Sequence, residues 1–128
     1  MLKVVVGHSD EADADYAISD ALAQCQTALA EQQPQAGILL SAVDFDYEVM
    51  LSQIYKTYPE LQLIGGTTDG EVSSQLGFQQ DSVVLVLFAS DTVTIQAGLG
   101  QSASQSPCAA AEQAVAQARR GQTEMPAL

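Results

Sequence analysis

The chain has 128 residues, of which 47% are hydrophobic, and it carries 16 acidic side chains against 4 basic ones. That length suits one domain, residues 1–128, whose apolar core needs no disulfide or metal to hold it. The net charge of −12 repels phosphates and anionic lipids, so the composition argues against binding to nucleic acid or to a membrane surface.

Neither a leader peptide nor a membrane span is apparent in the sequence. The longest apolar run, residues 83–89, is far shorter than the ~20 residues that span a bilayer. We therefore expect a cytoplasmic protein. Cys25 and Cys108 lack CxxC spacing, and in a reducing compartment we expect them to remain free thiols.

The first half of the chain alternates between strand and helix patterns. Residues 2–6 are a β-branched run that ends at Gly7, which predicts a buried strand. Ser9 or Asp10 is expected to cap a helix whose first turn carries Asp10, Glu11 and Asp13, and apolar residues three and four positions apart continue this helix to Leu29. Residues 37–43 then predict a strand, 47–58 an amphipathic helix and 61–64 a third strand that Gly65 and Gly66 end. This order is typical of a three-layer parallel core with the pattern β-α-β-α-β.

The second half of the chain has a different pattern. A continuous apolar run over 83–89 is followed by alternating apolar and polar residues over 93–99, which predicts an antiparallel β-hairpin. Ser106 and Pro107 then favour the start of a C-terminal helix that extends to Arg120. The sequence thus predicts an α/β fold in which a parallel core is extended by a hairpin and followed by a helix.

Small and polar residues gather where the three predicted parallel strands end. Because the carboxyl ends of parallel strands lie at one edge of a sheet, we expect a ligand-binding site there. The residues assigned to it are His8, Ser9, Ser41, Asp44, Gly65, Gly66, Thr67, Thr68, Asp69 and Glu71. The alternative is that these residues only form turns and helix caps.

Several kinds of chemistry lack their sequence signature. The segment GGTTDGE over 65–71 is neither a GxGxxG fingerprint nor a Walker loop, which argues against a nucleotide. The chain has no GxSxG elbow and no recognisable cysteine nucleophile, so we expect no enzymatic activity. The acidic residues over 44–48 lack the glycine and the final glutamate of a calcium loop.

His8 is the single histidine of the chain. One imidazole is too few for a typical zinc site but is enough for an axial haem ligand. The cofactor is therefore unknown from the residues, with haem on His8 as one candidate. The alternative for His8 is a polar residue that caps the following helix or orders the edge of the sheet.

Several segments together resemble the N-terminal FIST domain. They are GHSD over 7–10 with the acidic, Ala-rich helix after it, AGILLSAVDFD over 36–46, LIGGTTDGE over 63–71 with the later Gly77-Phe78, and SVVLVLFASD and TIQAGLG over 82–100. The resemblance runs from about Leu2 to about Gly121. It implies a bacterial sensory domain in which the loops after the first and third strands contribute to ligand binding. FIST proteins usually continue further, so we expect part of the N-terminal domain and the C-terminal FIST region to be absent.

The resemblance implies two functions. The first is a cytoplasmic sensor of a small ligand, such as an amino-acid-like metabolite, that passes its ligand state to a partner or attached histidine kinase or a similar output. The alternative is a nitric-oxide sensor with haem on His8, because one branch of the family, closest in its GHS and DFD segments, binds haem and controls a partner histidine kinase. A pure interaction domain is the third class.

Overall fold

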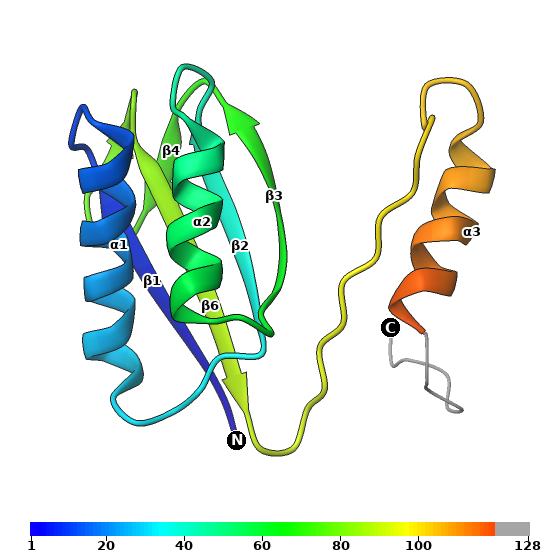
Figure 1. The fold of residues 1–128 in the computed structure, drawn as a ribbon, viewed down its shortest axis with the longest axis horizontal. Coiled ribbons are helices and arrows are strands. Elements are labelled where there is room, and N and C mark those ends of the chain that lie inside the picture. The colour runs from blue at the N-terminus through cyan, green and yellow to red at the C-terminus, as the bar shows by residue number, and fades with distance from the viewer. Residues whose placement is uncertain (120–128) are drawn as a thin grey trace. The chain divides into compact units, whose positions relative to one another are not determined.

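The structure, a computed structural model, describes residues 1–119. These residues separate into two compact units, one over Met1–Thr94 and one that begins at Ile95. The elements are, in chain order, β1 (Leu2–Ser9), α1 (Ala14–Leu29), β2 (Ala36–Ala42), α2 (Tyr47–Thr57), β3 (Gln62–Thr68), β4 (Glu71–Ser73), β5 (Gly77–Gln79), β6 (Val83–Ser90) and α3 (Pro107–Ala118) (Figure 1).

The first unit contains a four-stranded sheet with the order β1-β6-β2-β3. Strands β1, β2 and β3 point in the same direction, while β6 is antiparallel to both of its neighbours. The predicted α/β class is confirmed. The strand over 83–89 is nevertheless inserted between β1 and β2 instead of extending the sheet at its edge. Its almost continuous apolar sequence explains this position, because a central strand is buried on both faces.

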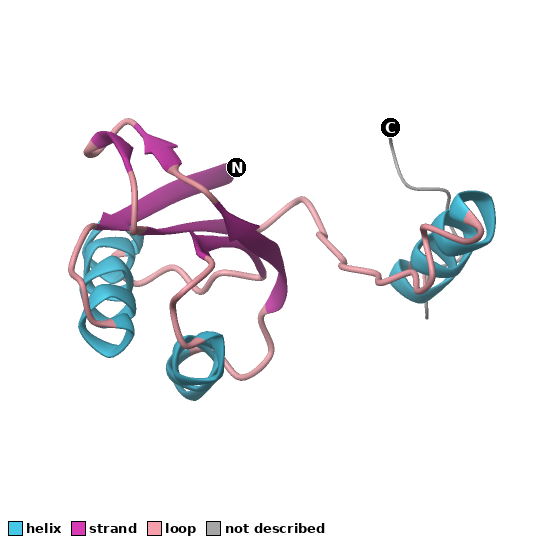
Figure 2. Cartoon of the chain, turned by 90° about the horizontal axis from the view of Figure 1, so that it is seen from above, coloured by secondary structure: helices cyan, strands magenta, loops and turns pink. Residues whose placement is uncertain are grey.

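Both helices of the first unit cover the same face of this sheet (Figure 2). This differs from the three layers that the sequence predicts. The connection from β1 to β2 through α1 and the connection from β2 to β3 through α2 step in the same direction across the sheet. Connections of one hand that step in one direction place their helices on one face, so the core has two layers.

The core lies between this face and the two helices. It is built mainly from Val5, Ile18, Leu22, Leu29, Leu39, Met50, Ile54, Leu61, Val83, Leu85 and Leu87. Cys25 of α1 is also buried there, and burial raises the pKa of its thiol to about 12. This agrees with the predicted free thiol, and Cys108 is also free and is exposed.

Strand β3 is longer than the sequence predicts. It extends through Gly65, Gly66 and Thr67 to Thr68, so the GGTT segment belongs to a strand and not to a loop. A short antiparallel hairpin, β4–β5, follows it. This hairpin lies on the sheet face opposite the two helices (Figure 2).

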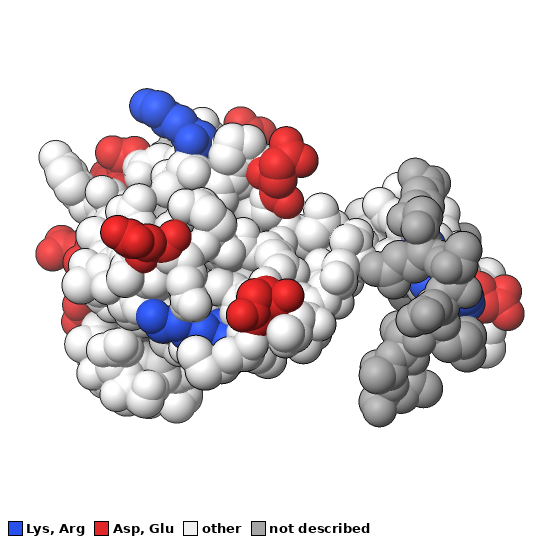
Figure 3. Space-filling model, turned by 90° about the horizontal axis from the view of Figure 1, so that it is seen from below, with Lys and Arg blue, Asp and Glu red and all other residues white. Residues whose placement is uncertain are grey.

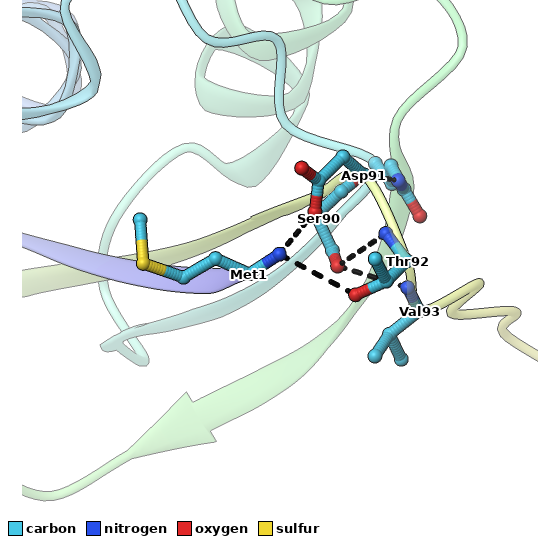
Figure 4. A network of polar contacts seen from close by, with 6 residues as sticks. Met1, Ser90, Asp91, Thr92 and Val93 are labelled. Atoms are coloured by element: carbon cyan, nitrogen blue, oxygen red, sulfur yellow. Dashed lines mark hydrogen bonds and ion pairs between the residues drawn. The ribbon is translucent and has the colours of Figure 1, made fainter.

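The expected second strand of a hairpin over 93–99 is not formed within the described residues. The chain turns away after β6, where the Ser90 hydroxyl accepts hydrogen bonds from the backbone N–H groups of Thr92 and Val93 (Figure 4). The Met1 ammonium group donates to the Asp91 carboxylate and to the Thr92 hydroxyl at the same place. The Ser90 bonds close a local turn and the Met1 contacts join it to the start of the chain, without a partner strand over 93–99, so the predicted hairpin is wrong.

The second unit consists of the extended segment from Ile95 and helix α3. The segment packs closely on the helix, since a Cβ atom at Gly98 would lie 1.9 Å from the carbonyl oxygen of Ala114. Side chains of α3 also accept hydrogen bonds from the segment: Gln117 accepts from the backbone N–H of Leu99, and Gln113 accepts from the backbone N–H of Gln101. The predicted C-terminal helix is present, and its predicted end at Arg120 lies outside the described residues.

Candidate functional site

The register of the sheet brings the ends of β1, β2 and β3 to one edge. Gly7 of β1, Leu39 of β2 and Gly65 of β3 lie in one row with Leu85 of the intervening strand β6. The predicted convergence of the three strands is therefore confirmed, although β6 separates the first from the other two. The connections do not reverse direction there, so this edge is not a topological switch point.

An open apolar groove lies between α2 and β3 and encloses about 350 Å³, at the lower end of the range for ligand pockets. We call it the α2–β3 groove. It is lined by Leu39, Ser41, Tyr47, Leu51, Tyr55, Leu63, Ile64, Gly65, Gly66 and Thr67. Four of the residues that the sequence assigned to a ligand site, at positions 41, 65, 66 and 67, thus line one groove.

Helix α2 supplies one wall of the groove through Tyr47, Leu51 and Tyr55, which are four residues apart and share one side of the helix. The two tyrosines are 59% and 40% exposed, while Met50 and Ile54 of the same helix point into the core. The amphipathic stripe of α2 therefore divides between core and groove. Each tyrosine offers an apolar ring and a hydroxyl group to a ligand.

Two neighbouring glycines form part of the opposite wall and differ in their surroundings. A Cβ atom at Gly65 would lie 1.9 Å from the carbonyl oxygen of Leu39, so β3 approaches β2 too closely there for any side chain. A Cβ atom at Gly66 would meet nothing within 4 Å. Gly65 is therefore required by the sheet, whereas Gly66, whose Cβ position alternates to the other face of β3, has room for a side chain.

Three other predicted residues, His8, Thr68 and Glu71, belong to a hydrogen-bond network on the opposite face of the sheet, which carries the β4–β5 hairpin. The imidazole of His8 bonds Ser73 through Nδ1 at 2.6 Å and Ser82 through Nε2 at 3.0 Å. The Ser82 and Thr68 hydroxyl groups each donate to one carboxylate oxygen of Glu71. We call these five residues the His8 network. It joins β1, the end of β3, β4 and Ser82, the residue before β6.

The hydrogen bonds of the network fix the tautomer of His8. The Ser73 hydroxyl oxygen already accepts from the backbone N–H groups of Gln75 and Leu76, so its proton is free to go to Nδ1. Because the Ser82 hydroxyl donates to Glu71, its oxygen accepts from Nε2–H of His8. His8 is buried, and desolvation lowers its pKa against the opposing effects of Glu71 and Asp10. The imidazole is therefore neutral at pH 7.

This geometry does not fit a role for His8 as a haem ligand. Both ring nitrogens are hydrogen-bonded, the residue is 1% exposed, and it does not line the α2–β3 groove. Its backbone is fixed as well, since the Gln24 side chain bonds the N–H and the carbonyl group of His8. Among residues 1–119, no group of three or more His, Cys, Asp or Glu side chains is placed to hold a metal ion.

Three predicted residues belong to neither the groove nor the network. Ser9 is buried at the end of β1, where its hydroxyl accepts weakly from the backbone N–H of Glu11 at 3.5 Å. Asp44 lies exposed in the turn before α2, and Asp69 lies exposed in the turn between β3 and β4. They match the turn and cap interpretation that the sequence left open.

The sequence interpretation missed the tyrosine wall of the groove and the two serines that bond His8. The sequence predicts an amphipathic helix over 47–58 but does not separate Tyr47 and Tyr55 from its core-facing residues, although two tyrosines on one flank are typical of a half-exposed surface. No local pattern marks Ser73 or Ser82, because their contacts to His8 span 65 and 74 positions.

Comparison with known proteins identifies the family. The model of the FIST N domain matches residues 35–127 of the chain. No curated protein matches. Among solved structures, the chain is similar to an empty FtsZ dimer from M. jannaschii, with 20% sequence identity and a TM-score of 0.40, over 69% of this chain and 26% of that one. No helix of the described residues is long and apolar enough to cross a membrane. Because the family model covers most of its length, the chain belongs to the FIST family, a family of sensory domains in signal transduction.

Proposed function

We propose that the chain is a cytoplasmic sensory domain that binds a small ligand in the α2–β3 groove and passes its ligand state to a histidine kinase or a similar output. The observation that carries the proposal is the groove itself. Separate segments of the chain bring Ser41, Gly66, Thr67 and the tyrosine wall to one cavity that is open to a ligand. This role is one of binding and not of catalysis.

The lining indicates the general character of the ligand. It is mainly aliphatic and aromatic, and none of the lining residues carries a charge. Polar partners are the hydroxyl groups of Ser41 and Thr67 and those of the two tyrosines. A ligand with an apolar body and a few uncharged polar groups, such as an amino-acid derivative, suits this surface.

The His8 network offers a route for the signal. Thr67 lines the groove, and the next residue, Thr68, bonds Glu71 at the start of the β4–β5 hairpin. A ligand that favours one position of β3 would therefore favour one position of the hairpin. Val72 and Phe78 of the hairpin are 72% and 62% exposed, so a partner protein can read that position.

We propose no role for haem, since both ring nitrogens of the buried His8 are hydrogen-bonded. An absorption spectrum of protein purified from haem-supplied cells provides the check. We expect no Soret band that depends on His8. A Soret band that His8→Ala weakens or shifts would contradict this expectation.

The groove is tested by filling it. Thr67→Leu enlarges a side chain that lines the groove on the face of β3 toward α2 and reduces the open volume, and Ser52→Leu makes the same kind of change at an exposed position of α2 outside the groove. A panel of small metabolites is screened by the shift in melting temperature. We expect ligands that stabilise the natural chain and Ser52→Leu but not Thr67→Leu. Equal shifts for all three proteins, or none with any candidate, would contradict the proposal.

A further inference from the structure

The outer edge of β3 carries backbone groups that face the groove. The N–H of Gln62 donates to the carbonyl of Gln35, 2.9 Å away, on the β2 side. Backbone groups of a strand alternate between its two edges, so Leu63, Gly65 and Thr67 direct their N–H and C=O groups away from β2. These three residues all line the α2–β3 groove.

This edge has no partner strand within residues 1–119, because β3 is the last strand of its sheet. The edge at the other side of the sheet is different. There, Gln24 bonds the outward N–H and carbonyl groups of His8, and Gln75 donates to the carbonyl of Val6. Side chains thus cover the outer edge of β1 near the site, and no described side chain bonds the outward backbone groups of Leu63, Gly65 or Thr67 of β3.

Resting on the proposed function, we infer that the ligand of the groove is a short peptide bound in an extended conformation as an added strand of β3. Its backbone pairs with the outward groups of Leu63, Gly65 and Thr67, and its alternate apolar side chains lie against Leu51 and Tyr55 of α2. A peptide backbone is uncharged, like the lining. A free amino acid lacks the repeated amide groups that this edge can pair with, and its two charges find no counterpart there.

The first test uses matched ligands with the natural chain. The probe is acetyl-Val-Leu-Val-amide, and its control is the same peptide with every backbone nitrogen methylated, which removes the donors that a strand needs. Isothermal titration calorimetry is expected to give a dissociation constant at least about tenfold lower for the probe than for the methylated peptide and for free leucine. Equal affinities for the two peptides would overturn the inference.

The second test changes the strand edge. Thr67→Pro removes an N–H that faces outward and leaves the β2–β3 hydrogen bonds in place, as proline permits on an edge strand. Thr67→Ala loses the same hydroxyl group but keeps the N–H. We expect Thr67→Pro to weaken peptide binding at least about tenfold more than Thr67→Ala does. Equal weakening in the two variants would overturn the inference.

The outcomes separate the two proposals. If free amino acids or other small metabolites bind in the groove and the peptide probe does not, the inference of a peptide fails and the proposed sensory function stands. If Thr67→Leu affects no ligand of any kind, the groove is not a ligand site and both fail. The matched peptides need no variant, so this result does not depend on whether Thr67→Pro folds.

Discussion

His8 shows how one residue can lie close to its predicted place and have a different role. The sequence places it in the loop after the first strand, whereas β1 extends through His8 to Ser9. Its ring nitrogens, however, form hydrogen bonds to Ser73 and Ser82, which lie far along the chain. No local sequence pattern predicts such contacts. The residue therefore ties the hairpin to the sheet. Its chemistry is that of a neutral, buried hydrogen-bonding group.

A pH dependence follows from the lowered pKa of His8. Burial holds this pKa below the ordinary value of 6.5, so the unfolded chain binds a proton at a higher pH than the folded chain does. The contribution to stability is complete above about pH 6.5 and decreases as the pH falls below it. Urea unfolding at about pH 7.5 and about pH 5.5 is expected to show a smaller loss of stability for His8→Gln than for the natural chain. Parallel losses in the two proteins would contradict this assignment.

The adjacent glycines of β3 give a matched pair of substitutions. In Gly65→Ala the new methyl group overlaps the Leu39 carbonyl, so we expect a loss of about 1–3 kcal/mol as the strands shift apart. In Gly66→Ala the methyl group meets nothing, and we expect a change within about 0.5 kcal/mol. Denaturant unfolding measures both. Equal losses would mean that Gly65 is not the point of closest approach.

At the scale of elements, the helices were predicted well and the strand connections less well. Helix α1 ends at the predicted Leu29 and α2 begins at the predicted Tyr47, because apolar spacing is a local signal. The predicted cap of α1 at Ser9 or Asp10 is wrong, since β1 extends to Ser9 and the Asp13 carboxylate caps the helix instead. The insertion of β6 between β1 and β2 depends on pairing across the whole chain. The three-residue strands β4 and β5 are too short to show a period of two, and the alternating residues over 93–99 found no partner strand.

The cap of α2 provides a prediction at this scale. The Asp46 carboxylate accepts from the backbone N–H groups of Glu48 and Val49 at 3.0 and 3.2 Å and so holds the start of the helix that walls the groove. We expect Asp46→Ala to lower the free energy of unfolding by about 1 kcal/mol. The neighbouring Asp44 is exposed in a turn, and Asp44→Ala is expected to change it by no more than about 0.5 kcal/mol. Thermal or urea unfolding of the pair checks this, and similar effects would show that the cap contributes little.

At the scale of the whole molecule, the excess of acidic residues acts on every approaching ligand. On the face drawn in Figure 3 the acidic side chains lie in separate groups and the basic ones are few. A net charge of −12 slows the approach of anions, and the uncharged groove gives them no partner. We expect binding of a neutral ligand to change little between about 0.05 M and about 0.5 M salt. Affinity that falls steeply with salt would instead indicate a cationic ligand held by the acidic surface.

The candidate site could be predicted in outline because the direction of strands fixes which loops meet. The positions at 41, 65, 66 and 67 were assigned on that basis, and they share the groove. The division between a groove on one sheet face and a buried network on the other could not be predicted. It depends on which way each residue of β3 points, and the sequence suggested that β3 ends at Ile64, before Gly65 to Thr68.

The most direct test of the account is where a ligand binds. Backbone amide chemical shifts are recorded by two-dimensional NMR while the ligand that gives the largest rise in melting temperature is added. We expect the largest shift changes on Gly65, Gly66, Thr67 and Tyr55, with smaller changes that continue through Thr68 and Glu71 into the hairpin. Changes confined to α3, or a titration that leaves β3 unaffected, would contradict it.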